Sequence, residues 1–545
     1  MRDEIAARTV PVAGRRRDLG DFQTPRALAQ AVLDRLWKGA PSFTRLLEPT
    51  CGRGVFLRES LALDPPPREL IGVEIHPPHA AEASRIASEF PEVPFRIIQG
   101  SVFHLDLGID LSWREDGPLL IVGNPPWVTA AELGRLGSGN SPTRRNLKDA
   151  SGLEARTGAS NFDLAEAVWI KLLEELAGIR PTIAMLCKTS VARAVLEQAR
   201  RRSIPIADAA LFEIDARRWF GAAVGACLMR ITVGPPGVPG VDTIPVFAEL
   251  EAERPRAHLG FRGGRLVADA PSIDRVSFGL GECPWTWRQG LKHDAADVME
   301  LEWSSDTVRS GWRNGLGEAV EVEAECLYPL IKGADLKGPS RGRRRRALIV
   351  TQRALGEDTE AIRDRWPLAW RYLERHAERL GSRRSSIYRG RPRFAIFGVG
   401  PYSFSPWKVA IGGLLRRPTF RVIGPVLGRP TMLDDTCYLL PCESAAEAAV
   451  LCALGNGPVA QTILAASSFP DAKRPVTKGL LQRVDLSAIL LRADDGELAA
   501  AAGDLLAGIG ADAGAEGASI PAVIERWKRE FRERSSPHAG DRGRQ

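Results

Sequence analysis

Four consecutive residues, Asn124, Pro125, Pro126 and Trp127, follow directly on the apolar run Leu119–Gly123. Their types suit the transfer of a group to an amine on a planar ring, which is a poor nucleophile because its lone pair is delocalised. The Asn124 side-chain carbonyl and the Pro125 backbone carbonyl can accept from both N–H bonds and draw the nitrogen toward a tetrahedral geometry. Two prolines stiffen the loop, and Trp127 can stack on the ring. Such a site works by orientation and dipoles, so we expect neither a covalent intermediate nor a metal.

A Gly-containing turn, Glu48–Gly54, lies upstream and joins an expected strand to an expected helix. Glycines there let a ligand approach the backbone closely, because they lack a Cβ and tolerate positive φ. Glu74 ends the next strand about 20 residues later, where its carboxylate can accept hydrogen bonds from both hydroxyls of a ribose. The turn lacks the third glycine of dinucleotide-binding proteins. S-adenosylmethionine has a ribose and an adenine but no pyrophosphate, and it is therefore the cofactor that we expect.

The elements that must position these residues alternate short apolar runs with helical stretches between about residues 46 and 231. This alternation predicts an α/β fold with a doubly wound, mostly parallel, Rossmann-like sheet. Strands are expected at 44–48, 70–74, 95–98, 119–123, 181–186 and 227–231, and a helix is expected at 25–37. The tetrapeptide would then lie at the carboxyl edge of the sheet, in the crevice where such folds bind ligands.

The segment 233–240 is rich in Pro and Gly and cannot continue a helix or an inner strand, so we place a domain boundary there. The expected organisation is a catalytic domain at 1–235 and a separate mixed α/β domain at 241–491. An Ala/Gly-rich linker with a charged C-terminal tail follows at 492–545, in which 497–519 is either a weak helix or a linker and a charged helix is expected near 520–533.

The composition of the 545 residues, 44% hydrophobic and 26% charged, is typical of a soluble globular protein. Apolar runs fall short of the roughly 20 residues that span a bilayer, and the N-terminus lacks an apolar signal core, so we expect a cytoplasmic protein without membrane contact. The eight cysteines are irregularly spaced, which favours reduced thiols. Cys437 and Cys442 lack the second pair of a zinc site.

Basic residues cluster in the second domain, and a further basic loop lies shortly after the tetrapeptide. Arginines can displace condensed counterions from the phosphates of a nucleic acid. The cations that we expect to hold such a polyanion are Arg144, Arg145, Arg343, Arg344, Arg345, Arg384 and Arg391. For any single run a solvated surface is the alternative, but two clusters in one domain favour a polyanionic partner.

The order of Phe22–Pro25, Glu48–Gly54, Glu74 and Asn124–Trp127 resembles the gamma class of N6-adenine DNA methyltransferases from restriction–modification systems. The resemblance covers roughly the first 235 residues. It implies methyl transfer from S-adenosylmethionine to adenine N6 in double-stranded DNA, with the target base rotated out of the stack. That class places a target-recognition domain after the catalytic one, and Leu327–Asp335 resembles a segment of such domains. Double-stranded DNA is the expected partner, and the sequence leaves open whether a cognate restriction endonuclease, encoded separately, is a second one.

The resemblance also assigns individual positions. The expected cofactor contacts are Thr24, Pro25, Glu48, Pro49, Thr50, Gly52, Gly54, Glu74, Ile75, Ser101 and Asn124. Phe220 would join Trp127 in packing on the extruded base, although a buried core position suits Phe220 equally well. Thr24 and Pro25 also suit an ordinary helix start.

One position departs from the family pattern. After the third strand the family often has Gly-Asp, whose carboxylate receives the adenine amino group of the cofactor, whereas here Gly100 precedes Ser101. Either Ser101 or Asp106 could accept that hydrogen bond.

Three alternatives stay open. An RNA or protein-glutamine N-methyltransferase solves the same chemical problem, but the long second domain disfavours it. A bifunctional restriction–modification enzyme would explain Phe469–Arg474, which faintly resembles a nuclease pattern but lacks a second acidic partner at useful spacing. A DNA-binding module with an inactive methyltransferase fold is disfavoured by the intact Asn124–Trp127 loop.

Overall fold

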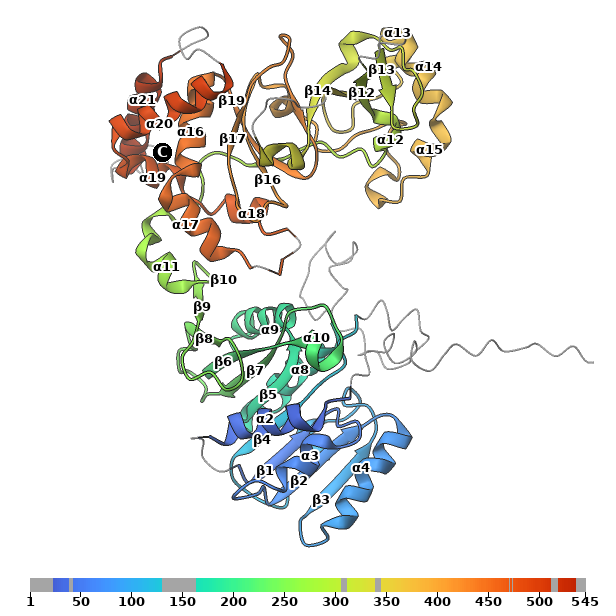
Figure 1. Cartoon of the computed structure of the whole chain (residues 1–545), viewed down its shortest axis with the longest axis vertical. Coiled ribbons are helices and arrows are strands. Elements are labelled where there is room, and N and C mark those ends of the chain that lie inside the picture. The colour runs from blue at the N-terminus through green and yellow to red at the C-terminus, as the bar shows by residue number, and fades with distance from the viewer. Residues whose placement is uncertain are drawn as a thin grey trace, which may run out of the picture. The chain divides into compact units, whose positions relative to one another are not determined.

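The computed structural model describes residues 23–38, 43–129, 163–304, 311–338, 345–469, 471–472, 474–510 and 518–535. The chain divides into two compact units, Met1–Ala270 and Pro271–Gln545, coloured blue to green and green to red in Figure 1.

The first unit is built on a ten-stranded sheet in the order β10-β9-β8-β6-β7-β5-β4-β1-β2-β3. Its strands are β1 (Arg45–Glu48), β2 (Glu69–Glu74), β3 (Phe95–Gln99), β4 (Leu119–Gly123), β5 (Thr182–Lys188), β6 (Ile206–Ile214), β7 (Ala226–Val233), β8 (Thr243–Phe247), β9 (Ala257–Arg262) and β10 (Arg265–Val267). Strands β3, β2, β1, β4 and β5 are parallel neighbours, and β7 runs antiparallel between β5 and β6. The predicted doubly wound, mostly parallel α/β sheet is confirmed.

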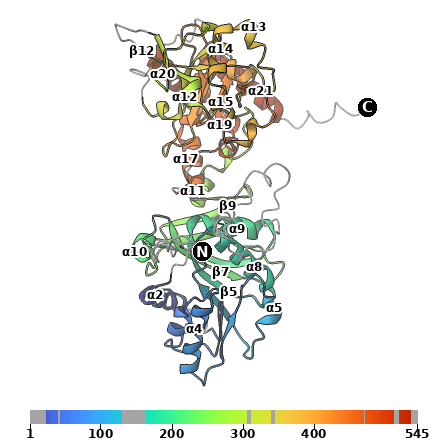
Figure 2. The same ribbon diagram turned by 90° about the vertical axis from the view of Figure 1, so that its right-hand side faces the viewer.

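Helices cover both faces of this sheet. They are α2 (Arg26–Trp37), α3 (Val55–Ser60), α4 (Pro77–Glu89), α5 (Leu107–Asp110), α8 (Leu164–Glu175), η1 (Ala177–Ile179), α9 (Thr189–Arg201) and α10 (Ala216–Phe220). Figure 2 shows α2 and α4 on one side of the strands, and α5 and α8 on the other. Because both faces are covered, every residue of β2 and β4 is buried, as parallel strands in α/β folds require.

The division between the units lies at Ala270, not at the predicted boundary of 233–240. The chain after this Pro/Gly-rich segment returns to the same sheet: β8 pairs in parallel with β6, and β9 pairs antiparallel with β8. The segment is therefore a connection between β7 and β8 within the first unit, because a loop that crosses between strands needs the same turn residues as a linker.

The second unit contains two smaller sheets, in the orders β11-β19-β16-β17 and β13-β12-β15-β14-β18. The strands are β11 (Arg288–Gln289), β12 (Glu300–Ser304), β13 (Gly311–Asn314), β14 (Leu327–Ile331), β15 (Arg346–Ile349), β16 (Trp407–Gly412), β17 (Arg421–Ile423), β18 (Met432–Leu433) and β19 (Cys437–Cys442). The helices are α11 (Ala270–Arg275), η2 (Ser277–Gly279), α12 (Ala296–Met299), η3 (Ala324–Cys326), η4 (Gly333–Lys337), α13 (Ile362–Arg365), α14 (Pro367–Arg375), α15 (Ala377–Gly381), η5 (Ser386–Tyr388), η6 (Pro401–Phe404), α16 (Ala445–Asn456), α17 (Pro458–Ser467), α18 (Lys478–Leu481), α19 (Leu486–Arg492), α20 (Asp495–Ile509) and α21 (Ile520–Ser535).

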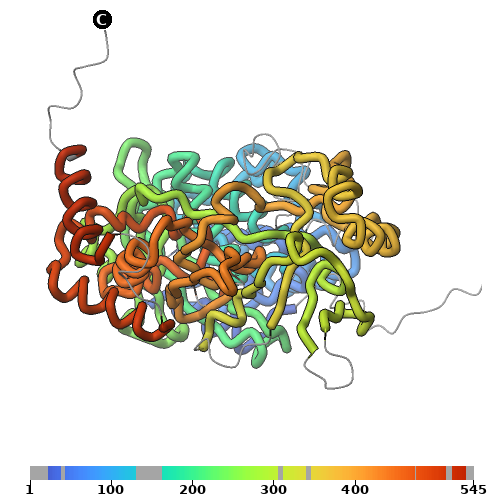
Figure 3. The backbone as a smooth tube through the Cα atoms, turned by 90° about the horizontal axis from the view of Figure 1, so that it is seen from above, coloured from blue at the N-terminus to red at the C-terminus, as the bar shows by residue number. Residues whose placement is uncertain are grey.

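The C-terminal residues, expected to be a linker and tail, form packed helices, and the helix expected near 520–533 is confirmed as α21. Figures 1 and 3 show α20 and α21 beside the rest of the second unit, and both contact α16. Leu498 and Leu506 of α20 are buried, and Trp527 of α21 lies edge-on to Trp285 with ring centroids 5.0 Å apart. The prediction underrated alanine-rich sequence, which buries little area per residue but permits close helix packing.

All eight cysteines are free and buried. Among the described residues, no single helix has the length and apolar composition to span a membrane, whereas the bent pair α16 and α17 meets that test when taken together.

Lys408 is a buried cation in β16. Its side chain is 1% exposed, and Nζ donates to the Ser405 carbonyl at 2.5 Å. Burial disfavours the charged form and lowers the pKa of Lys408 to about 8. A shift of this size corresponds to a penalty on the order of 3 kcal/mol for keeping the ammonium charged in the folded protein.

We therefore expect Lys408→Met to raise the free energy of unfolding at neutral pH by about 1–2 kcal/mol, because a buried charge is replaced by an apolar group of similar volume. The folded-state pKa lies below the ordinary value of 10.5, so the folded chain binds fewer protons between about pH 8 and 10.5. Wild-type stability should gain from this group as pH rises through that window, and the variant should lack the gain. Urea unfolding of both proteins across the window measures the difference, and parallel curves would contradict the assignment.

Candidate functional site

A cavity of about 370 Å³ opens at the carboxyl ends of the central strands of the first unit. Its lining comes from the segment before α2, the β1–α3 turn, the ends of β2, β3 and β4, and α8: Gln23, Thr24, Glu48, Pro49, Thr50, Cys51, Gly52, Val55, Val73, Glu74, Ile75, His76, His79, Gly100, Ser101, Val102, Phe103, Asn124, Pro126, Val128, Leu164 and Val168. The structure therefore brings together most of the predicted cofactor positions. Pro25 and Gly54 lie outside the lining.

Gly54 instead shapes the turn. It adopts φ +78° as the N-cap of α3, and a Cβ there would lie 3.2 Å from the Cβ of Ala83 on α4. Gly52 also has positive φ, and a Cβ on it would lie 2.9 Å from Gln23 Oε1. Both positions favour glycine because φ is positive and a Cβ would lie close to another residue. Of the two, only Gly52 lines the cavity.

Glu74 has its carboxylate fixed by the backbone. Its Oε2 accepts from the Gly52 N–H at 2.8 Å, and its Oε1 accepts from the His76 N–H at 2.6 Å. These bonds hold the side chain at the mouth of the β1–α3 turn. Each carboxylate oxygen has a second lone pair, so the group keeps acceptor capacity for a ligand hydroxyl.

Glu48 presents the opposite situation. It is 2% exposed, and Oε2 has no hydrogen-bond partner among the described residues. Desolvation by burial, with the nearby Glu74 charge adding to it, raises the pKa of Glu48 well above its ordinary range. The buried hydroxyl oxygen of Thr50 likewise has no partner in the described part of the chain. Native proteins rarely leave buried polar atoms unsatisfied, so the pair marks a place for a polar ligand.

Cys51 also lines the cavity, but it suits no nucleophilic role. Burial raises the pKa of its thiol far above the ordinary value, so the sulfur stays protonated. The thiolate is the reactive form of cysteine.

The Asn124–Trp127 loop leaves β4 at the cavity. Asn124 and Pro126 line the cavity, whereas Pro125 and Trp127 are buried behind it. The indole of Trp127 is 6% exposed, donates to the Leu186 carbonyl at 3.4 Å, and lies edge-on to Phe220 with centroids 5.2 Å apart. The predicted pair of aromatics is thus in contact, while its stacking on a base stays a prediction.

Lys188, at the end of β5, is a residue that sequence reasoning missed. Its Nζ donates to the Trp127 carbonyl at 2.9 Å and pairs with Asp163 Oδ2 at 2.7 Å. Asp163 in turn caps α8 by accepting from Ala165 N. Lys188 therefore ties the end of the loop to the start of α8. The signal that could have pointed to Lys188 was a lysine at the end of a buried strand. It was not sufficient, because the residues that Lys188 contacts are distant in the sequence.

Of the two candidates for the adenine contact, Ser101 lines the cavity and is 6% exposed. Asp106 is outside the lining, and its Oδ1 accepts from the Gly108 and Ile109 N–H groups as the N-cap of α5. The geometry favours Ser101.

The predicted substrate-binding cations have different positions. Arg144, Arg145, Arg343 and Arg344 lie outside the described residues. Arg384 and Arg391 are exposed, and Arg345 is exposed with its guanidinium 4.7 Å from the ring centroid of Trp303.

The cavity fits S-adenosylmethionine by its own chemistry. Glu48 and Glu74 line the cavity that would receive this ligand, and the unsatisfied atoms of Glu48 and Thr50 could pair with its polar groups. Ile75, 46% exposed beside Glu74, offers an apolar surface to a flat ring. A doubly wound sheet with such a cavity beside an Asn-Pro-Pro-Trp loop defines a methyltransferase domain.

Comparisons with known proteins identify the family. No protein-family model matches the chain. It is 35% identical over 479 residues to the type II methyltransferase M.NspV of Nostoc sp., which covers 87% of this chain and 97% of that protein. It is 34% identical over 115 residues to the type II methyltransferase M.CvrRI of Paramecium bursaria Chlorella virus XZ-6E, covering 21% of this chain and 26% of that protein. The type IIL restriction–modification enzyme MmeI, solved in complex with DNA, matches with a TM-score of 0.49 at 14% identity, covering 96% of this chain and 80% of that one.

The chain therefore belongs to the type II methyltransferases of restriction–modification systems, which methylate DNA with S-adenosylmethionine as cofactor.

The buried Glu48 carboxyl should make the unliganded protein sensitive to pH. Its folded-state pKa exceeds the unfolded value of 4.5, so the folded chain binds more protons above that pH. Wild-type stability should therefore fall relative to Glu48→Gln as pH rises above about 4.5, by up to roughly 1.4 kcal/mol per pH unit. Thermal unfolding of both proteins without cofactor measures this. Equal pH profiles for wild type and Glu48→Gln would contradict the assignment.

Lys188 should position the loop. We expect Lys188→Met to reduce kcat for methyl transfer roughly tenfold to a hundredfold, because small misplacements of a reacting group are costly. The KM for S-adenosylmethionine should change little, since Lys188 is outside the cavity lining. Lys188→Arg should recover part of the rate. A merely structural role would lower the melting temperature and leave kcat per folded enzyme intact, and that result would overturn the assignment.

Proposed function

We propose that the chain is a site-specific adenine methyltransferase that transfers the methyl group of S-adenosylmethionine to adenine N6 in double-stranded DNA. The observation that carries this proposal is that Asn124 and Pro126 open into the same cavity as Glu48 and Glu74. An amine held by the loop would therefore lie beside the cofactor.

Each residue has a distinct task in this scheme. S-adenosylmethionine supplies an activated methyl group on sulfur. Glu74 would hold the ribose of the bound cofactor, and Ser101 would accept from its adenine amino group. The Asn124 side-chain carbonyl and the Pro125 backbone carbonyl accept from the target amine and orient its lone pair. The reaction is then an in-line displacement that needs orientation and fixed dipoles.

Base rotation follows from the position of the cavity. Adenine within a duplex cannot reach a cavity inside the sheet edge, so the nucleotide must leave the stack at a cost of a few kcal/mol. Trp127 and Phe220, in edge-on contact at the loop, would pack on the extruded base. The second unit, with Arg384 and Arg391 exposed, would grip the duplex and select the site, and a separately encoded endonuclease would cleave the same sequence.

Asn124→Ala tests the catalytic part of the proposal. We expect methyl transfer to plasmid DNA from a methylation-free host to fall roughly 10² to 10³-fold, as when a preorganised polar group is removed from other active sites. Binding of S-adenosylmethionine and of duplex DNA should change little. The measurement is transfer of labelled methyl groups, followed by digestion and identification of N6-methyladenine.

The acceptor is tested with the wild-type chain. Label in DNA as N6-methyladenine supports the proposal. Label on cytosine would overturn the adenine assignment, and label in RNA or in protein but not DNA would favour the alternative acceptors. Retained activity in Asn124→Ala would remove the loop from the mechanism.

A further inference from the structure

An exposed aromatic cluster lies on the five-stranded sheet of the second unit. Trp303 of β12 and Trp312 of β13 are directly opposite in the antiparallel register, with ring centroids 5.2 Å apart and planes at 83°. The Arg345 guanidinium is 4.7 Å from the Trp303 centroid and 5.6 Å from the Trp312 centroid. The Trp303 N–H donates to the Arg345 carbonyl at 2.8 Å, so the backbone fixes the same arrangement.

This cluster is open to solvent. Trp303 is 38% exposed, and Arg345 is exposed. Large aromatic rings are usually covered in folded chains, and exposed ones often mark contact surfaces. A guanidinium held against a ring keeps its plane and its fork of donors fixed, so it loses less freedom when it binds a partner.

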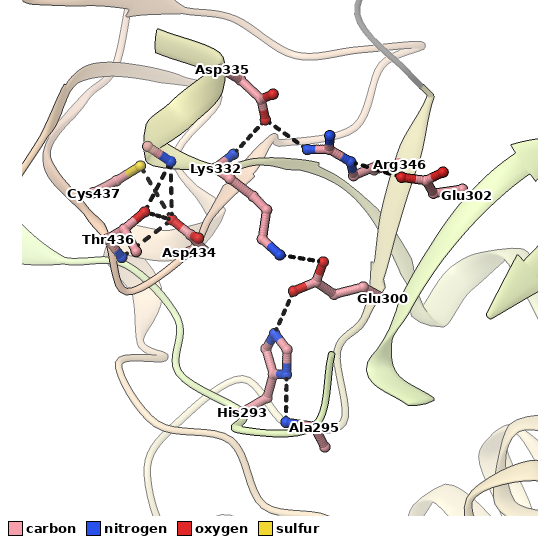
Figure 4. Close-up of polar contacts among 11 residues, drawn as sticks. His293, Ala295, Glu300, Glu302, Lys332, Asp335, Arg346, Asp434, Thr436 and Cys437 are labelled. Carbon is pink, nitrogen blue, oxygen red and sulfur yellow. Dashed lines mark hydrogen bonds and ion pairs between the residues drawn. The ribbon is translucent and has the colours of Figure 1, made fainter. Parts of the chain in front are cut away.

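The cations around Arg345 are already paired, as Figure 4 shows. Arg346 donates to Asp335 at 2.8 Å and to Glu302 at 3.2 Å, and Lys332 pairs with Glu300 at 2.7 Å. Among the described residues, no carboxylate pairs with Arg345. Within the described part of the chain its positive charge is therefore not offset by a carboxylate, while Arg346 and Lys332 are both paired.

The same network fixes the base of the cluster. Asp335 accepts from the Lys332 N–H at 2.8 Å as well as from Arg346, and Glu300 accepts from His293 Nε2 at 3.3 Å. These contacts join the segment after β14 to β12 and β15. The Leu327–Asp335 segment thus supports the start of β15, next to Arg345, and Lys332 of this segment is itself paired with Glu300.

We propose that Arg345, held against Trp303 and Trp312, contacts the phosphate backbone of duplex DNA. The inference rests on the proposed function. Arg345 is the third of four consecutive arginines in the sequence, Arg343–Arg346, and such a density of charge fits a polyanion. Its planar fork matches two phosphate oxygens at once. A phosphate contact positions the duplex and carries no sequence information by itself.

The test is the affinity of the full chain for a short mixed-sequence duplex, measured by fluorescence anisotropy over a series of salt concentrations. Arg345→Ala should weaken binding about tenfold at low salt and reduce the slope of log K against log salt by about one. Trp303→Leu, which leaves all charges in place, should weaken binding about threefold with the slope unchanged.

Arg363→Ala is the matched control. Arg363 is also exposed and lies 4.8 Å from the Trp370 ring centroid, but it is in α13, outside the arginine run. We expect the Arg363→Ala variant to have the same affinity for the duplex, and the same slope of log K against log salt, as the wild type.

The outcomes separate this inference from the proposed function. Failure of the wild type to bind duplex DNA or to methylate it would refute the proposed function itself. A wild type that binds and methylates, with Arg345→Ala unchanged in affinity and slope, would overturn the inference alone. So would a loss confined to DNA fragments that carry the methylated site, because that pattern belongs to a base contact.

Discussion

The parallel pairing of β1 with both β2 and β4 is the constraint on which the site depends. Leu46 is opposite Leu70 on one side and Leu120 on the other. The three strands therefore end near one level, and the chain turns at one edge after each of them. A one-residue slip would exchange the two faces of a strand, each of which packs on different helices. The strand register and its apolar packing thus fix the places of Glu48, Glu74 and Asn124.

The two acidic side chains in the cavity differ in whether the fold satisfies their hydrogen-bonding atoms. Glu74 is satisfied by two backbone N–H groups, so its position costs little in the unliganded protein. Glu48 is equally buried but keeps an unpaired oxygen, and its raised pKa reports the cost of that burial. A rigid acceptor can be built into the backbone, whereas a group reserved for a ligand must remain unsatisfied until the ligand arrives.

The sequence predicted the elements that large apolar residues define. Strands β1 to β5, β7 and helix α2 were anticipated, because buried parallel strands form continuous aliphatic runs. The boundary at 233–240 was wrong because β8 to β10 are short, and the sequence left 497–519 open between weak helix and linker because the buried face of α20 is small. Most of the predicted cofactor positions line one cavity, since motif and strand end coincide. Lys188 could not, because its partners Trp127 and Asp163 are 61 and 25 residues away.

The arginines of the second unit show that the number of basic residues in a sequence does not give the number of positive charges that a partner can contact. Arg383, beside Arg384, donates to the carbonyls of residues 380, 293 and 395, so its guanidinium serves the fold. Arg346 follows Arg345 directly in the chain, but its guanidinium is paired with two carboxylates. Successive side chains along an extended strand point to opposite faces, so consecutive arginines have different surroundings. An electrostatic surface for a polyanion is therefore built from the cations that the fold leaves without carboxylates.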